Sequence, residues 1–138
     1  SAMLAHDAQC AAAGVTTVLD ALCLGDLGFD PGRGQTFREG VEDLDALAET
    51  GLLKAEHFLH LRCELPAPDM KPALEPVAEH PRVRMVSLMD HSPGIGQYRD
   101  MDRYRALRKR QREMTDADVE RRIGELLDQR ARLREPQR

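Results

Sequence analysis

The sequence predicts an α/β fold in which parallel strands alternate with crossover helices. Three runs rich in apolar and β-branched residues, at 15–19, 57–66 and 83–89, are separated by segments whose apolar residues recur at helical spacing. This alternation is typical of βα units, whose strands are parallel and whose crossovers are right-handed. We expect three βα units over residues 1–97, followed by a basic helical pair over residues 98–138.

The length and composition describe one ordinary globular domain. The chain has 138 residues, of which 41% are hydrophobic and 32% charged, while only 4% are aromatic. Few aromatic rings leave few platforms on which nucleic-acid bases could stack. The sequence contains neither a signal-peptide pattern nor an apolar run of membrane-spanning length. We therefore expect a cytoplasmic protein that binds neither nucleic acid nor a membrane.

Charge and cysteine content add two expectations. The net charge of −4 conceals an excess of basic residues after Arg99, so this tail could meet anions. Nucleic-acid binding through the tail has only this charge in its favour. The three cysteines, Cys10, Cys23 and Cys63, have no metal-ligand spacing and lie within or beside apolar runs. They are expected to be reduced, buried thiols.

The first elements in order are a helix, a strand and a loop. Residues 6–13 are rich in alanine and predict the end of a helix, which Gly14 can stop in a left-handed conformation. Residues 15–19 predict a strand covered on both faces, ending at Asp20. The glycines of residues 25–34 predict a mobile loop without a phosphate-binding motif.

The middle of the chain repeats the pattern. Residues 36–50 carry apolar side chains at helical spacing and predict a crossover helix that Gly51 ends. After the strand at 57–66, residues 72–79 predict a short helix, and residues 83–89 a third strand.

The strand at 57–66 carries a polar row. Because successive side chains point to opposite faces, His60, Arg62 and Glu64 share one face of the strand. The other face carries the apolar residues Leu59, Leu61, Cys63 and Leu65. Burying such a row costs free energy unless its members are paired, bound to a metal or open to water. Glu64 lies at the carboxyl end, before Pro66 interrupts the ladder, and parallel α/β sheets bind ligands at that end.

Polar residues also follow the other two strands. Asp20 closes the first and Asp90 with His91 the third, so these groups and Glu64 are expected to converge at one mouth. Each could equally be an ordinary turn residue, because loops favour Asp. The glycines and prolines of residues 90–97 would let the loop backbone approach a ligand closely.

Two helices are predicted after that loop. The first, residues 100–112, is strongly basic, and the second opens at Thr115 with Asp118 at capping-box spacing. An apolar stripe follows Val119 along the second helix. Its arginines form either a solvated face paired with neighbouring acids or a phosphate-binding surface. These arginines are Arg121, Arg122, Arg130 and Arg132.

Four motifs carry a resemblance to a known family. They are HDA at 6–8, GVTTVLDA at 14–21, LHLRCEL at 59–65 and VSLMDHSPG at 86–94. They resemble the PhnM family of the carbon–phosphorus lyase pathway, which belongs to the amidohydrolase superfamily. The resemblance implies a partial (β/α)8 TIM-type barrel and a metal-dependent hydrolase, which releases pyrophosphate from α-D-ribose 1-methylphosphonate 5-triphosphate, a phosphorylated sugar phosphonate.

The resemblance also implies missing parts. A complete barrel needs roughly 250 residues, whereas this chain supplies three βα units. We therefore expect an internal part of a longer enzyme, inactive by itself, whose other metal motifs lie before Ser1 and after Arg138. Residues 95–96 are Ile-Gly where the family usually carries Gln-Arg, so a basic contact in that loop is absent.

Roles follow by resemblance where positions match. Glu64 is the leading ligand for a divalent metal, Zn or Mn, and His91 is the second candidate unless it is only a hydrogen-bonded structural residue. Arg62 either forms an ion pair with Glu64 or faces phosphate. His60 is expected to be structural, and His57 and His80 to lie outside the site. The expected substrate contacts are Arg62, Asp90, Ser92 and Gln97.

A second function class stands beside the enzyme. Three strands with unpaired edges would tend to associate with other copies of the chain. The alternative is thus a non-catalytic α/β unit, a homo-oligomer that at most binds phosphate.

Overall fold

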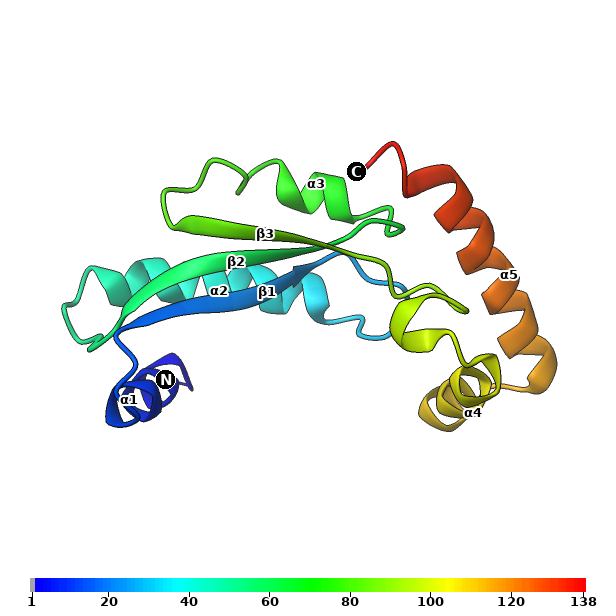
Figure 1. Cartoon of the computed structure of the whole chain (residues 1–138), viewed down its shortest axis with the longest axis horizontal. Helices are drawn as coiled ribbons and strands as arrows, with labels where there is room; N and C mark the ends of the chain where they lie inside the picture. The colour runs from blue at the N-terminus through cyan, green and yellow to red at the C-terminus, as the bar shows by residue number, and fades with distance from the viewer. Residues whose placement is uncertain (1) are drawn as a thin grey trace.

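The computed structural model describes residues 2–138. The elements in chain order are α1 (Ala2–Ala12), β1 (Thr17–Leu24), α2 (Arg33–Ala48), β2 (Glu56–Glu64), α3 (Met70–Leu74), β3 (Val83–Met89), the 3-10 helix η1 (Gly96–Tyr98), α4 (Met101–Arg112) and α5 (Asp116–Leu133). The strands form one sheet, with α1 near their amino ends and α4 and α5 beyond their carboxyl ends (Figure 1). The α/β class is confirmed.

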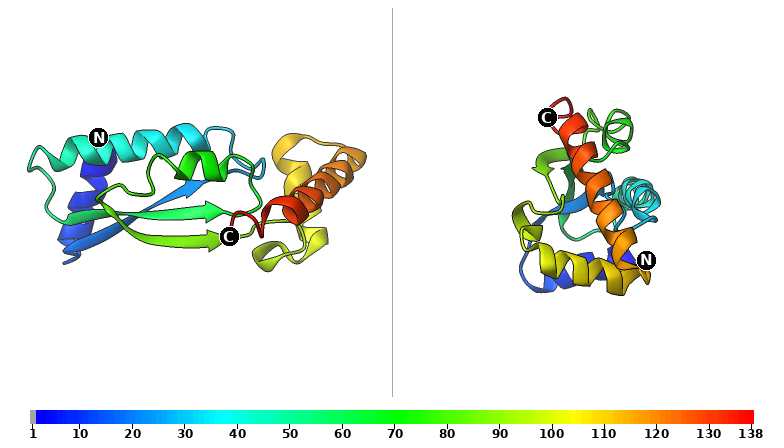
Figure 2. Two further views of the ribbon diagram at one scale, coloured as in Figure 1. Left: turned by 90° about the horizontal axis from the view of Figure 1, so that it is seen from above. Right: turned by 90° about the vertical axis from the view of Figure 1, so that its right-hand side faces the viewer.

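The sheet has the order β1-β2-β3, and both pairs of neighbours are parallel. Helices α2 and α3 cover one face of it (Figure 2). On this face Leu59, Leu61 and Cys63 of β2 are buried in the core, as the alternation of the strand predicts.

Burial raises the pKa of the Cys63 thiol. All three thiols are free, but Cys10 and Cys23 are only half-buried.

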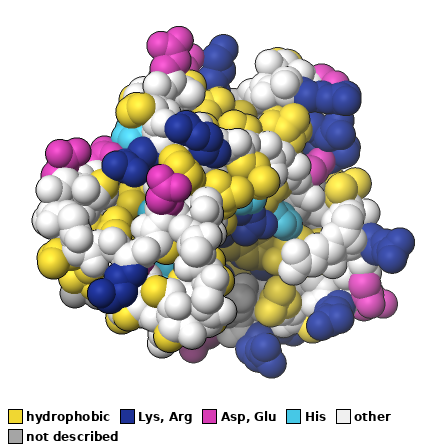
Figure 3. All heavy atoms as spheres, turned by 60° about the vertical axis from the view of Figure 1, so that its left-hand side comes forward, with side chains coloured by type: hydrophobic (Ala, Val, Ile, Leu, Met, Phe, Trp, Pro, Cys, Tyr) yellow, Lys and Arg dark blue, Asp and Glu magenta, His cyan; other side chains and the backbone are white. Residues whose placement is uncertain are grey.

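The other face of the sheet is open along its middle. Its central side chains on β2, Phe58, His60 and Arg62, are half-buried, and in residues 2–138 no helix crosses over them (Figure 2). A space-filling view shows a hollow in the molecule where basic and histidine side chains lie among hydrophobic ones (Figure 3).

Several element boundaries differ from the sequence prediction. Helix α2 spans Arg33–Ala48 rather than residues 36–50, and β2 ends at Glu64 rather than at residue 66. Strand β1 does not end at Asp20 but continues to Leu24, because residues 21–24 pair with residues 60–63 of β2. Helix α3 ends earlier than predicted and is followed by turns, because Pro76 lacks the backbone N–H that would continue the helical hydrogen bonds.

Both C-terminal helices begin at the predicted residues. The Asp100 carboxylate accepts a hydrogen bond from the backbone N–H of Arg103 and caps α4. Thr115 and Asp118 form a capping box at α5. Along α5, Val119 and Ile123 are buried as the apolar stripe predicts.

The helical pair is fastened to the loop after β1. Arg108 of α4 is buried and donates hydrogen bonds to the carbonyls of Leu27 and Gly28 at 3.1 and 3.0 Å. The ring of Phe29 from the same loop stacks on Tyr98, with centroids 5.3 Å apart. The helices therefore lie against the carboxyl end of the sheet.

No helix in residues 2–138 is both long and apolar enough to cross a membrane.

Candidate functional site at the carboxyl end of the sheet

The central contact of the site joins Glu64 to His91. Glu64 is the last residue of β2 and only 1% exposed, and the loop after β3 brings His91 to it. The backbone N–H of His91 donates to Oε1 of Glu64 at 2.7 Å, and its ring Nδ1 lies 2.5 Å from Oε2. The sequence therefore correctly predicted that Glu64 and His91 meet at this end of the sheet.

This contact sets the orientation of the imidazole. A carboxylate beside Nδ1 favours a proton on that nitrogen and leaves Nε2 as the lone-pair donor of a neutral ring. Nε2 of His91 has no hydrogen-bond partner among residues 2–138, and the ring packs edge-on against Tyr98 with centroids 6.0 Å apart. The pair thus presents one free nitrogen donor.

Asp90 is held from two directions. Its carboxylate accepts from the backbone N–H of Ser92 at 3.1 Å, and Arg130 and Arg134 of the C-terminal helical segment lie 2.7 and 3.2 Å from it. Burial alone would raise the pKa of Asp90, but the contacts with Ser92 and Arg130 outweigh burial and lower it. Asp90 is therefore an anion that anchors this segment to the loop after β3.

The other predicted substrate residues have different environments. Ser92, in the loop after β3, is fully buried, whereas Gln97 is exposed and lines a pocket beside α4. Arg62 makes no ion pair with any residue in 2–138, so the expected pair with Glu64 is wrong. Adjacent same-face positions of a strand are roughly 7 Å apart, and the Glu64 carboxylate turns to His91 instead.

Three histidines lie where the sequence predicts. His60 shares a hydrogen bond with the Ser87 hydroxyl at 2.9 Å and is structural. His57 lies toward the amino ends of the strands, and His80 pairs with Asp45 of α2 at 2.9 Å. Both are outside the site.

Asp20 does not join the carboxyl-end mouth. It sits inside β1, and its carboxylate lies 2.6 Å from Nδ1 of His57. The predicted convergence of three strand endings is therefore wrong for the first strand. The pairing with His57 compensates an acidic side chain that would otherwise be unfavourable within a sheet.

Two arginines of α5 fit the predicted solvated face, and a third takes neither predicted role. Arg122 pairs with Glu125 at 3.2 Å and Arg121 with Asp118 at 2.9 Å, as a solvated face requires. Arg130 instead reaches Asp90 in the site loop. Sequence reasoning missed this contact, because no local pattern links a helix to a loop so distant in the chain.

Metal binding needs more ligands than this cluster offers. Across residues 2–138, no three His, Cys, Asp or Glu side chains are grouped so that they could hold an ion. Glu64 and His91 provide two donors of suitable chemistry, whereas structural and catalytic zinc sites use three or four protein ligands.

Comparison with known proteins identifies a relative. No family model matches the chain, and no solved structure matches it significantly. All 138 residues align, at 38% identity, with the protein of Escherichia coli (strain K12) named alpha-D-ribose 1-methylphosphonate 5-triphosphate diphosphatase. This chain resembles part of that diphosphatase. The alignment covers 36% of the relative's length, and it confirms the resemblance that the motifs indicated.

Proposed function

We propose that the chain forms part of a metal-dependent diphosphatase of phosphonate metabolism, of the amidohydrolase type. Its three parallel βα units would be a segment of a (β/α)8 barrel. The reaction would release pyrophosphate from α-D-ribose 1-methylphosphonate 5-triphosphate. The observation that supports this best is the buried Glu64 carboxylate, which holds His91 with a free Nε2 at the carboxyl end of parallel strands.

Zn²⁺ or Mn²⁺ is the proposed cofactor, with Glu64 and His91 among its ligands. A bound divalent ion would polarise a phosphoryl oxygen and lower the pKa of a water molecule. The fit is incomplete, because residues 2–138 offer only this pair. The isolated chain is therefore expected to be inactive.

The residues of the chain would contribute positioning and charge. Glu64 holds the His91 ring so that Nε2 faces away from the carboxylate. Arg62, on the open face of the sheet and without an ion pair, is available to a phosphate or phosphonate oxygen. Asp90 and Ser92 shape the loop after β3, and Gln97 is exposed beside it.

The test compares two substitutions at opposite ends of β2 in a complete enzyme that contains this segment. Glu64→Gln should reduce pyrophosphate release by at least about tenfold to a hundredfold, together with metal content. Glu56→Gln, at an exposed position far from His91, is the matched control and should change neither. Normal pyrophosphate release and full metal content in Glu64→Gln would contradict the proposal.

Self-association is a second candidate property. Val86 and Leu88 of the edge strand β3 are 52% and 53% exposed, although they lie on the helix-covered side of the sheet. Exposed apolar groups beside an unpaired strand edge favour association between copies, which supports a homo-oligomer.

The proposal also includes a cytoplasmic location and no nucleic-acid or membrane partner.

A further inference from the structure

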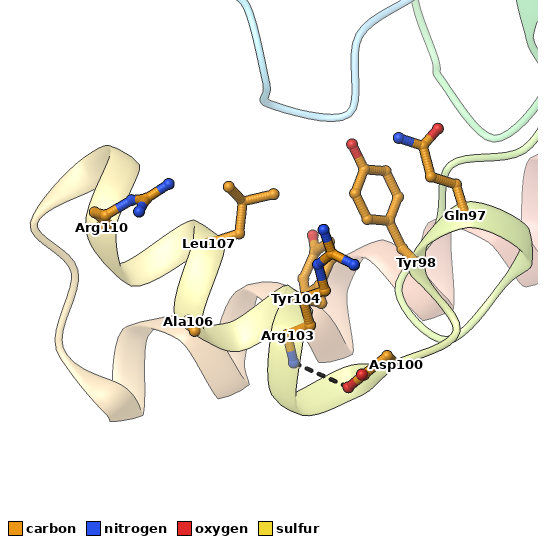
Figure 4. A pocket seen from close by; sticks show the side chains of 8 residues that line it. All are labelled: Gln97, Tyr98, Asp100, Arg103, Tyr104, Ala106, Leu107 and Arg110. Carbon is orange, nitrogen blue, oxygen red and sulfur yellow. Dashed lines mark hydrogen bonds between the residues drawn. The ribbon is translucent and has the colours of Figure 1, made fainter.

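A pocket lies between η1 and α4. It has a volume of about 510 Å³ and is lined by residues of these two elements and their connection. The lining residues are Gln97, Tyr98, Asp100, Arg103, Tyr104, Ala106, Leu107 and Arg110. Figure 4 shows the side chains of Gln97, Tyr98, Arg103 and Arg110 extending toward the same open side of α4.

The two arginines of this pocket differ from the other basic residues of α4. Arg105 and Lys109 pair with acids of α5, while Arg108 and Arg112 donate to backbone carbonyls of the loop after β1. Arg103 and Arg110 make no side-chain hydrogen bond or ion pair within residues 2–138. The backbone N–H of Arg103 donates to the Asp100 carboxylate, which leaves the guanidinium of Arg103 uninvolved.

Tyr104 supplies a second, independent observation. It lines the pocket and is 2% exposed, and its buried hydroxyl makes no hydrogen bond within residues 2–138. The guanidinium of Arg108 donates to Leu27 and Gly28 and also lies near this hydroxyl, but burial outweighs its effect and raises the pKa of Tyr104. A buried hydroxyl without a partner costs free energy, which a polar ligand group would offset only by reaching that hydroxyl.

We propose that this pocket binds the polyphosphate group of a small-molecule ligand, through Arg103, Arg110 and Gln97. Arg103 and Arg110 stand two turns apart on one face of α4, roughly 10 Å along the axis. That spacing favours an extended polyanion over a single phosphate. Because residues after Arg99 carry an excess of basic side chains, a control at another arginine of this segment must separate binding in the pocket from general attraction.

The pocket adjoins the Glu64–His91 pair through Tyr98. The Tyr98 ring lines the pocket and contacts the His91 ring edge-on, at 6.0 Å between centroids. A ligand held by α4 could therefore extend a phosphate toward His91. The assignment of this polyphosphate to the hydrolysed substrate rests on the proposed function. Binding of a polyphosphate in the pocket does not depend on that function.

Binding is tested with the metal-free chain, inorganic triphosphate and isothermal titration calorimetry at low ionic strength. Arg103→Gln and Arg110→Gln should each weaken triphosphate binding by at least about tenfold, because each removes a charge-assisted contact. Arg132→Gln removes the same charge from an exposed position of α5 and should leave binding unchanged. Orthophosphate should bind more weakly than triphosphate.

A fourth variant should move affinity in the opposite direction. Asp100→Asn removes the one carboxylate that lines the pocket, while Asn still caps the helix. Triphosphate should then bind more tightly, with an unchanged melting temperature. The proposal is overturned if the chain does not bind triphosphate, or if Arg132→Gln weakens binding as much as the pocket variants do. Since no metal or turnover is involved, failure of the hydrolase proposal would leave this result intact.

Discussion

Nδ1 of His57 lies 2.6 Å from a carboxylate oxygen of Asp20, and Nε2 of the same ring lies 3.1 Å from Asp7. His57 therefore bridges two carboxylates through its two ring nitrogens. Asp7 also accepts from the backbone N–H groups of Lys54 and Ala55. This hydrogen-bonded cluster joins α1, β1, β2 and the turn before β2 at the amino end of the sheet.

Removing the His57 ring should destabilise the fold strongly. His57→Leu leaves two carboxylates without their shared partner at a site where His57 is 1% exposed. We expect the free energy of unfolding to fall by about 3 to 5 kcal/mol, measured by urea denaturation. His6→Gln is the control, because His6 contacts the same Asp20 from a side chain that is 50% exposed. Its cost should stay below about 1 kcal/mol, and equal losses in the two variants would contradict this interpretation.

The same cluster predicts a pH dependence. The pKa of Asp7 is lowered, first by the backbone N–H of Ala55 and then by that of Lys54. A carboxyl whose folded pKa lies below its unfolded value of about 3.9 stabilises the fold above that pH. The stabilisation is lost as the pH falls through the folded pKa. Asp7→Asn should lower the melting temperature near neutral pH, and the gap from the unmodified chain should narrow below about pH 4. A constant gap would exclude ionised Asp7 as its source.

At the opposite end of the sheet, Glu64 should control the tautomer of His91. In Glu64→Gln the amide can present an N–H₂ group to Nδ1, which must then accept, so the proton moves to Nε2. Nitrogen NMR of the imidazole should show a proton on Nδ1 in the unmodified chain and on Nε2 in the variant. Glu56→Gln should leave the signals unchanged. A ring that keeps its Nδ1 proton in Glu64→Gln would show that another group sets the tautomer.

The sequence predicted best those features of the fold that depend on a single local pattern of residues. Periodicity at 83–89 predicts the third strand with the bounds that the structure has, and the capping box at Thr115 predicts the start of α5. Alternation in β2 correctly assigns Leu61 and Cys63 to the core. These features depend on residues close together in the chain, and local geometry therefore determines them.

Long-range pairing explains the failures. Asp20 looks like a strand end because acidic residues are uncommon within strands, but His57 compensates it. Likewise Arg130 resembles a solvated helix residue, whereas the fold places it beside Asp90. Sequence reasoning did find the Glu64–His91 pair, because both residues end neighbouring parallel strands and such ends share one edge.

Exposed apolar groups on β3 predict how the chain associates. Val86 and Leu88 present their side chains beside an edge whose backbone groups have no neighbouring strand within residues 2–138. Association would remove this apolar surface from water and pair the edge. Light scattering after gel filtration should therefore show a mass above that of one chain, increasing with concentration.

Two charge substitutions locate the contact. The double substitution Val86→Lys and Leu88→Lys should shift the measured mass toward that of one chain. Burying two ammonium groups at an interface costs more free energy than the apolar contacts contribute. Leu127→Lys changes an equally apolar side chain, 40% exposed on α5 and away from the sheet edge, and should leave association unaltered. A single-chain mass for the unmodified protein at high concentration would refute association, whereas an equal effect of Leu127→Lys would place the contact elsewhere.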